Sequence, residues 1–328
     1  MNFSDVIGQE KIVAHMKSAI LEKKLSHAYI LSGEKGSGKK LISGIFAAAI
    51  QCEKGLGSPC GECQSCKQAA GGNNPDIHWI THEKPNVISV DEIRVQLNSD
   101  ITIKPYSRPH KVYIIDEAEK MNEQAQNAIL KTIEEPPEYA VIILLVTNEK
   151  LFLPTILSRC ILLNLRAVSK AKIQKLLEEK HGISGYMAEV AAGFADGVPG
   201  RAIEFAESDR FIELKADVLS LLKRVDGMDA GQLYGAIKGW SDKAELQERL
   251  SLTNMWYRDI LVAKSTDDTV GILFKDEETA IYNAASELSY QEIIRKLDAI
   301  STLKERIKAN VNLDASLMLL FLTLRDRG

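Results

Sequence analysis

Short apolar runs alternate with helical patterns along the first half of the chain. Four apolar runs predict buried strands, at 28–31, 77–80, 112–115 and 141–146. Segments with apolar residues at helical spacing surround these runs, at 12–21, from about 41, from 89 to about 97, and at 125–133. Ser89 is followed three residues later by Glu92, which is typical of a capping box at a helix start. This alternation predicts an α/β domain over residues 1–165, with a parallel sheet covered by helices on both faces.

The strand-like runs stop after Leu165. Three helical segments follow, at 173–177, 185–195 and from about Arg201, and Gly182 is positioned to end the first. We expect them to form a small three-helix unit over residues 166–207. From 208 to 328 the pattern is helical throughout, with long amphipathic segments at 211–225, 244–263 and 289–309. The sequence thus predicts three domains.

Composition limits the functions open to the chain. With 328 residues, 45% of them apolar and 26% charged, it can build two or three ordinary domains. Lys and Arg number 41 against 45 acidic residues, so there is no general basic field for gripping nucleic acid, and any DNA contact must be local or shared with partners. The N-terminus lacks the layout of a secretory signal, and no apolar run approaches the roughly 20 residues that span a bilayer. We therefore expect no membrane association and a cytoplasmic location.

A glycine-rich segment, GEKGSGKK at 33–40, lies between a predicted strand and a predicted helix. In this context glycines let backbone N–H groups surround phosphate oxygens, and the lysine at position 39 can reach the terminal phosphates. The next position should carry a Ser or Thr hydroxyl that ligates Mg²⁺, but it is Lys40, whose ammonium cannot bind a metal while charged. We predict a degenerate nucleotide site at which ATP and Mg²⁺ binding is doubtful, and a glycine turn without a ligand is the alternative. The candidate residues in this segment are Gly33, Gly36, Gly38 and Lys39.

The run at 112–115 ends in Asp116 and Glu117, which has the form of a Walker B strand. Such a strand delivers its acids to the carboxyl edge of the sheet, beside the phosphate loop. In a working ATPase the Asp orients the metal shell and the Glu polarises the attacking water. These two residues complete the degenerate nucleotide site, although a solvated acidic strand end is the alternative. The polar pair Thr147-Asn148, after the next buried strand, is a weaker candidate for contact with the terminal phosphate.

Four of the five cysteines lie in one short stretch, with the spacing C-x7-C-x2-C-x2-C. Four thiolates suit a closed tetrahedral Zn²⁺ site, and a closed shell leaves no position for a substrate. We predict structural zinc, with free thiols or disulfides as the main alternative. A zinc ribbon that touches DNA is less favoured, because Lys54 and Lys67 supply few basic groups. The predicted ligands are Cys52, Cys60, Cys63 and Cys66.

The order of these motifs resembles the clamp-loader subunits of bacterial DNA polymerase III, which belong to the AAA+ family. The order continues with LKTIEEPP at 130–137, Ser158-Arg159-Cys160 and an all-helical last third, so the resemblance spans nearly the whole chain. It implies an AAA+ P-loop parallel-sheet domain with a zinc-binding insertion at 52–66. It also implies that residues 166–207 form a three-helix lid and that residues 208–328 form an all-α collar that holds a ring.

In that family, Ser-Arg-Cys supplies an arginine finger in trans. Carried onto this sequence, Arg159 is the finger, and its guanidinium would stabilise charge on a γ-phosphoryl group in a neighbouring subunit. Taken alone, the tripeptide would indicate only a surface arginine in a salt bridge. Arg201 is similar to the position from which AAA+ lids reach nucleotide, with a surface cap or ion pair as the alternative.

The missing hydroxyl at Lys40 separates the groups within the family. The motor subunits, gamma and tau, carry an intact phosphate loop, and tau has a long C-terminal extension, so this chain is more similar to the non-motor subunits. The resemblance implies a hetero-oligomeric ring with gamma or tau and delta subunits, which contacts the sliding clamp and primer-template DNA as a complex. The chain is not expected to be catalytic alone, but to be a component of the DNA polymerase III holoenzyme.

Two other functions stay open on sequence grounds. One is an autonomous P-loop ATPase, like the gamma and tau motors, in which another group completes the Mg²⁺ shell. The other is a zinc-dependent DNA-binding adaptor, which the near-neutral charge disfavours.

Overall fold

The computed structural model describes residues 2–82, 84–183, 185–241, 243–266, 271–309 and 311–326. The chain divides into two compact units. The first comprises Met1–Ile173 together with Gly197–Gly200, and the second comprises Gln174–Asp196 and Arg201–Gly328. The finer division into three domains stays a prediction.

The first unit contains a five-stranded parallel sheet with the order β2-β3-β4-β1-β5. Its strands are β1 (Ala28–Ser32), β2 (Ile77–Ile80), β3 (Lys111–Ile115), β4 (Ala140–Val146) and β5 (Ile161–Asn164). The four runs predicted as strands are confirmed, and the apolar stretch after Ser158-Arg159-Cys160 adds the edge strand β5. Because all strands run in one direction, their carboxyl ends meet along one edge, where the phosphate loop and the acidic strand end lie together.

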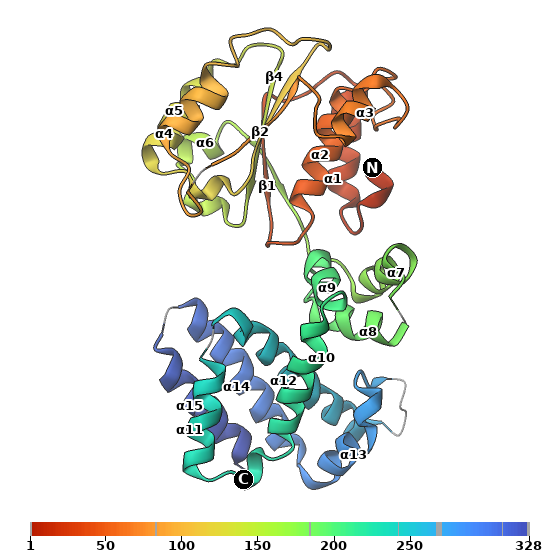
Figure 1. Ribbon diagram of the computed structural model, residues 1–328, viewed down its shortest axis with the longest axis vertical. Coiled ribbons are helices and arrows are strands. Elements are labelled where there is room, and N and C mark those ends of the chain that lie inside the picture. The colour runs from red at the N-terminus through yellow and green to blue at the C-terminus, as the bar shows by residue number, and fades with distance from the viewer. Residues whose placement is uncertain are drawn as a thin grey trace. The chain divides into compact units, whose positions relative to one another are not determined.

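Helices cover both faces of the sheet, as the α/β prediction requires (Figure 1). One face carries α1 (Glu10–Leu21), α2 (Lys39–Ile50) and α3 (Gln64–Ala70). The other carries α4 (Val90–Ile93), α5 (Glu123–Glu134) and α6 (Pro154–Leu157). Short helical turns connect these elements: η1 (Phe3–Asp5), η2 (Arg94–Asn98), η3 (Ala118–Lys120) and η4 (Glu149–Leu151). Ser89 and Glu92 form the predicted capping box at the start of α4.

The central strand β4 explains why its sequence is apolar without interruption. All seven of its residues are buried. Alternate residues, Ile142 and Leu144 among them, pack with α4, α5 and α6, whereas Ile143 and Leu145 pack with α1 and α2. A parallel strand between two helical layers must be apolar on both sides, so no period of two is visible.

Within the described residues, the second unit is helical. Two of the helices begin in the first unit: α7 (Lys170–His181) and α9 (Pro199–Ala206). The others are α8 (Gly185–Phe194), α10 (Asp209–Leu222), α11 (Ala230–Trp240), α12 (Lys243–Ser265), α13 (Glu278–Glu287), α14 (Tyr290–Lys308) and α15 (Leu313–Arg325), with turns η5 (Val225–Gly227) and η7 (Lys275–Glu277). Gly182 adopts φ +65° directly after α7, which fits its predicted role in ending that helix. Among the described helices, none combines the length and apolar character that a bilayer-spanning segment needs.

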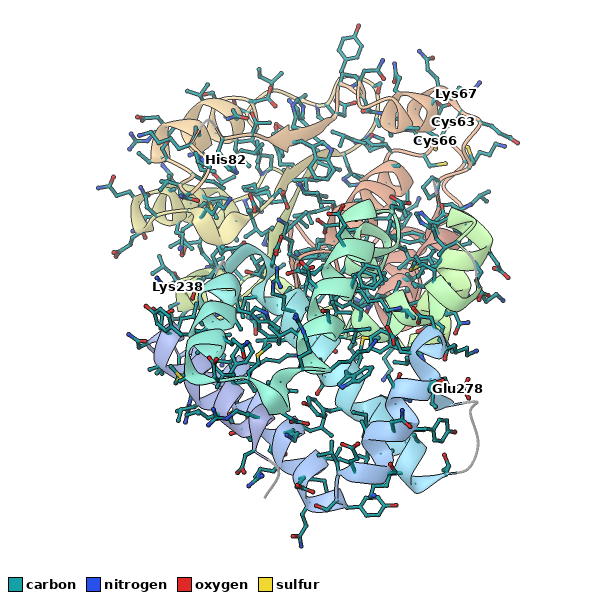
Figure 2. The ribbon with its side chains drawn as sticks, turned by 60° about the horizontal axis from the view of Figure 1, so that its bottom comes forward. Cys63, Cys66, Lys67, His82, Lys238 and Glu278 are labelled. Atoms are coloured by element: carbon teal, nitrogen blue, oxygen red, sulfur yellow. The ribbon has the colours of Figure 1, made fainter. Side chains whose placement is uncertain are left out.

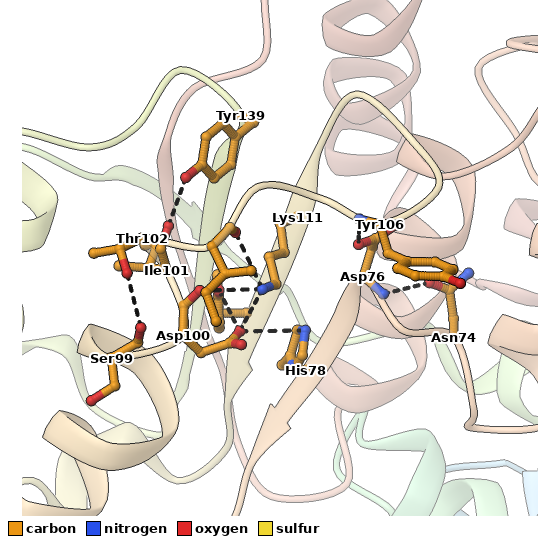
Figure 3. Close-up of polar contacts among 12 residues, drawn as sticks. Asn74, Asp76, His78, Ser99, Asp100, Ile101, Thr102, Tyr106, Lys111 and Tyr139 are labelled. Atoms are coloured by element: carbon orange, nitrogen blue, oxygen red, sulfur yellow. Dashed lines mark hydrogen bonds and ion pairs between the residues drawn. The ribbon is translucent and has the colours of Figure 1, made fainter.

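A network of buried polar groups fixes the opposite edge of the sheet, at the amino ends of β2 and β3 (Figure 3). The carboxylate of Asp76 is fully buried and accepts hydrogen bonds from the backbone N–H groups of Tyr106 at 2.6 Å, Ser107 at 2.9 Å and Arg108 at 3.3 Å. Beside it, the buried ammonium of Lys111 lies 2.7 Å from the carboxylate of Asp100. These contacts hold the long connection before β3 in place.

Replacing Asp76 with alanine should leave three backbone N–H groups without their acceptor. Each unsatisfied buried donor costs about 1–3 kcal/mol, and the groups share one carboxylate, so we expect the free energy of unfolding to fall by about 2–4 kcal/mol. Chemical denaturation of the full chain measures this loss. The exposed carboxylate of Asp91 makes only a 3.6 Å contact with Arg94, so Asp91→Ala should change stability by less than about 0.5 kcal/mol. Equal effects of the two substitutions would contradict the assigned role of Asp76.

Candidate functional site

The phosphate loop connects the end of β1 to the start of α2, the context that its sequence predicts. Gly36 and Gly38 adopt φ +85° and +97°, which side chains with a Cβ rarely allow. A Cβ at Gly33 would lie 2.9 Å from the Ser37 hydroxyl and 3.0 Å from Leu165. The backbone angles favour glycine at 36 and 38, and the side chains of Ser37 and Leu165 leave little room for a Cβ at Gly33.

Lys39 is folded back onto the loop that carries it. Its ammonium donates hydrogen bonds to the carbonyl oxygens of Gly33 at 2.5 Å and Glu34 at 2.9 Å, and the residue is buried. Burial lowers the pKa of Lys39, while the carboxylates of Glu119 and Asp116 oppose that shift. Hydrogen bonds to its own loop thus hold the lysine beside the acidic strand end, whose carboxylates stabilise its charge.

Both acids that follow β3 are paired with lysines of this chain. The ammonium of Lys40 lies 2.6 Å from a carboxylate oxygen of Asp116. The carboxylate of Glu117 lies 2.5 Å from the ammonium of Lys120 and 3.6 Å from the ring of His82. The hydrogen bond from Lys120 lowers the pKa of Glu117. Glu117 also has a left-handed backbone at φ +48°, an arrangement that a non-glycine residue adopts only at a cost.

Thr147, the weaker candidate for phosphate contact, lies at the same edge. Its backbone N–H and its hydroxyl donate to one carboxylate oxygen of Glu119, at 3.1 and 2.6 Å. The neighbouring Asn148 has a different task, because its side chain caps η4 by accepting a hydrogen bond from the N–H of Lys150. Of this polar pair, Thr147 is the residue that faces the phosphate loop.

A cavity of about 390 Å³ lies between the phosphate loop and the acidic strand end. Its lining comprises Lys35, Gly36, Gly38, Lys39, Lys40, Leu41, Asp116, Glu117, Glu119, Leu145 and Thr147. Loop N–H groups and lysine ammoniums suit the phosphates of a nucleotide. Mg²⁺ does not fit as it does in a working ATPase, because an ammonium, and not a hydroxyl, lies 2.6 Å from Asp116.

Arg159 lies outside that cavity, in the turn between α6 and β5. Its guanidinium contacts the carboxylate of Glu134 at 3.1 Å and donates to the carbonyl oxygen of Thr155 at 3.1 Å. About 40% of its side chain is exposed. The adjacent Cys160 packs against the core, and burial raises the pKa of its thiol to about 12. The turn is therefore anchored by Cys160 while Arg159 faces solvent.

The four predicted metal ligands meet at one place. Their sulfur atoms all lie within 4.8 Å of one another, and those of Cys60 and Cys66 are 3.9 Å apart. Bonds of about 2.3 Å in a tetrahedron separate sulfurs by about 3.8 Å, so the set fits a metal ion. Figure 2 labels Cys63 and Cys66 next to each other, with Lys67 beside them. The Cys63 sulfur also caps α3 by accepting from the N–H of Cys66.

The thiols of this cluster differ in acidity. Backbone N–H groups of Cys63 and Glu62 point at the sulfur of Cys60 and lower its pKa to about 6. Burial instead raises the pKa of Cys66 to about 12. Thiolates are the metal-binding form, so an N–H-stabilised sulfur favours a bound cation.

The backbone of Gly200, at the start of α9, lies against the phosphate loop. Its N–H donates to the carbonyl oxygen of Gly36 at 2.9 Å. A Cβ at Gly200 would lie 2.7 Å from that oxygen. The neighbouring Arg201 lies 4.0 Å from the carboxylate of Asp196, and its role toward nucleotide stays a prediction.

A parallel five-stranded sheet with a phosphate loop after β1 and an acidic pair after β3 defines a P-loop protein of the AAA+ type. A family model described as "DNA polymerase III, delta subunit" matches residues 8–169. The tau subunit of DNA polymerase III from Bacillus subtilis is 31% identical over 93% of this chain, which spans 58% of that protein's length. The delta′ subunit from the same organism is 27% identical over 97% of this chain and 96% of its own. The chain is similar to the tau and delta′ subunits of bacterial DNA polymerase III.

Among solved structures, a DNA polymerase III gamma subunit-related protein from Thermotoga maritima aligns with 22% identity and a TM-score of 0.45. The alignment covers 96% of this chain and 99% of that one.

The sequence led us to most of this site but not to its internal ion pairs. Gly36, Gly38, Lys39, Asp116 and Glu117 line one cavity, Gly33 belongs to the same loop, and the four clustered cysteines meet at one place. Their roles toward nucleotide and metal stay predictions. The contributions of Glu119, Lys120 and Lys35 were not foreseen. Lys120 follows Glu117 by three residues, and that spacing was a signal for the pair.

Substituting Cys63 with serine should remove one of the sulfur ligands, whereas the serine hydroxyl can still cap α3. We expect the metal content of the purified chain, measured by elemental analysis, to fall to near zero together with a lower melting temperature. Cys160→Ser is the matched control, because that cysteine lies outside the cluster. The Cys160→Ser variant should keep its metal even if the core around residue 160 packs less well. Equal loss of metal in both variants would contradict the assignment of Cys63 as a ligand.

Gly200→Ala should force the start of α9 away from the phosphate loop. The clash is with backbone, which yields little, so we expect a destabilisation of about 1–3 kcal/mol in thermal or chemical unfolding. Gly235 in α11 has open space around its Cβ position, and Gly235→Ala should stabilise the chain by about 0.5–1 kcal/mol. Stabilisation by both substitutions would show that the close approach at Gly200 is not required.

Proposed function

We propose that the chain is a non-motor clamp-loader subunit of the delta-prime type, which completes the ATP site of a neighbouring motor subunit with Arg159. The observation that carries this proposal is the 2.6 Å ion pair between Lys40 and Asp116. It occupies the place where a motor subunit needs a hydroxyl and Mg²⁺. A chain with that pair is poorly suited to hydrolyse ATP in its own site.

The surroundings of Arg159 support its use in trans. The guanidinium is absent from the lining of the chain's own phosphate cavity. Its ion pair with Glu134 is about 40% exposed on both sides, and such pairs contribute only about 0–1 kcal/mol. The side chain can therefore exchange Glu134 for phosphate oxygens at small cost, and its planar fork suits two of them at once.

The partners follow from the family. We infer a hetero-oligomeric ring with gamma or tau motor subunits and a delta subunit, which loads the sliding clamp onto primer-template DNA. The DNA polymerase III names of the tau and delta′ relatives support this inference. In this proposal residues 166–207 act as the lid and residues 208–328 as the collar. The proposal keeps the cytoplasmic location expected from the sequence.

For the cysteine cluster we propose a structural zinc ion. Four sulfur donors in a closed set favour Zn²⁺ and leave no open position for catalysis. The ion would fasten the segment between α2 and α3 to the end of α2, because Cys52 lies two residues after that helix and Cys66 belongs to α3. The role of the metal is to hold the insertion folded.

The competing function is an autonomous motor of the gamma or tau type. It is kept because the tau subunit of Bacillus subtilis is 31% identical over 93% of this chain. ATP turnover by the chain alone, abolished by Lys39→Ala, would support that function over the one proposed here.

The decisive experiment reconstitutes the ring with motor and delta subunits and follows ATP hydrolysis in a single turnover. Arg159→Ala should slow hydrolysis by about 10³-fold at the one site that faces this chain. The substitution removes the positive charge that stabilises the γ-phosphoryl group in the transition state. Arg159→Lys should rescue only part of the rate, since a lysine ammonium cannot bind two phosphate oxygens in the planar, bidentate way of a guanidinium.

Two controls separate catalysis from assembly. Arg166→Ala removes another exposed arginine and should leave the rate unchanged. Size-exclusion chromatography must find each variant incorporated into the ring. An unchanged rate for Arg159→Ala in an intact ring would refute the proposal.

A further inference from the structure

Lys40 places a positive charge where related ATP sites hold a metal. Its ammonium lies 2.6 Å from the carboxylate of Asp116, the residue whose counterpart organises the Mg²⁺ shell in a working ATPase. We propose that this tethered ammonium replaces Mg²⁺, so that the cavity binds a nucleoside polyphosphate without a divalent metal. The inference goes beyond the proposed function, which requires no nucleotide in this chain.

The charges of the cavity are already balanced without a metal. Asp116 is paired with Lys40, and Glu117 is paired with Lys120 at 2.5 Å. The carboxylate of Glu119 accepts two hydrogen bonds from Thr147 and acts electrostatically on Lys39. Each acid that would otherwise attract Mg²⁺ therefore has a cation of the chain nearby. A divalent ion at Asp116 would lie within a few ångströms of the Lys40 ammonium, which repels it.

Hydrogen-bond donors for a phosphate chain remain in the cavity even though its acids have cations of the chain nearby. Gly36, Gly38 and the N-terminus of α2 line it, and so do Lys35 and Lys39. Lys39 already donates to two loop carbonyl oxygens, and its ammonium has a third donor. About 70% of the Lys40 side chain is exposed, against 20% for Asp116. A pair with one such exposed partner is weak, so Lys40 can turn toward a phosphate oxygen while staying near Asp116. The volume of about 390 Å³ is in the range of small-molecule sites.

The metal dependence of binding follows from this arrangement. Free ATP carries more negative charge than its Mg²⁺ complex, so a site built on ammonium groups should prefer the free form. Replacing Lys40 with threonine restores the hydroxyl of the ordinary phosphate loop and releases the Asp116 carboxylate. The variant should therefore need Mg²⁺ to bind the same ligand.

The test is isothermal titration of the full chain with ATP, once in Mg²⁺ and once in EDTA. We expect the wild type to bind at least as tightly in EDTA as in Mg²⁺. Lys40→Thr should reverse this order, with binding about tenfold weaker in EDTA than in Mg²⁺, because one charge-assisted contact is lost and a metal site is gained. Lys40→Arg keeps the cation and should keep the wild-type order.

Lys11→Thr, at an exposed position on α1, is the matched control for loss of a surface lysine and should behave as the wild type. Because Lys40 is mostly exposed, thermal melting should find all variants folded. If the wild type binds ATP only in Mg²⁺, or does not bind it at all, the proposal is wrong. If Lys40→Thr is the only variant that binds ATP, the Lys40 ammonium blocks the cavity, and that result also contradicts the proposal. None of these outcomes bears on Arg159, so the proposed function is tested separately.

Discussion

The ion pair between Lys40 and Asp116 joins the phosphate loop to the acidic strand end. A phosphate loop and a Walker B strand normally converge on a hydrated Mg²⁺, and the metal connects them to the triphosphate. Here the loop and the strand are connected directly, by an ammonium and a carboxylate 2.6 Å apart. The fold keeps the loop, strand and acids of a phosphate-loop protein, and the Lys40 ammonium is paired with the acid that in a working ATPase faces the metal. In the proposed assembly, the catalytic contribution is then made elsewhere on the surface, by Arg159.

The scaffold explains how one chain can separate these two tasks. The parallel sheet collects the phosphate loop and the acids at its carboxyl edge, and Asp76 with Lys111 and Asp100 fixes the opposite edge. Arg159 belongs to neither group, because it lies in a turn between α6 and β5 whose cysteine packs into the core. A rigid sheet therefore supports a nucleotide-type cavity and a half-exposed arginine at distinct places.

Prediction from the sequence succeeded where the physical signal is local. The strands of the central sheet are apolar because both faces are buried, and the glycines at Gly36 and Gly38 are required by their positive φ angles. The spacing of the cysteines limits how far apart their sulfurs can lie. The pairing of Lys120 with Glu117 was missed, although both belong to one short segment. The edge strand β5 was not among the predicted strands, because it is short and partly exposed.

The sequence by itself determined the α/β class, the phosphate loop with its missing hydroxyl, the acidic strand end and the set of clustered cysteines. Tertiary structure decided which charges meet. Lys40 and Asp116 are far apart in the chain and become neighbours only because β1 and β3 run parallel with β4 between them. In the same way, Arg159 meets Glu134 only when α5 and the turn after α6 pack together. Long-range charge pairing depends on the spatial order of the elements, which no local pattern specifies.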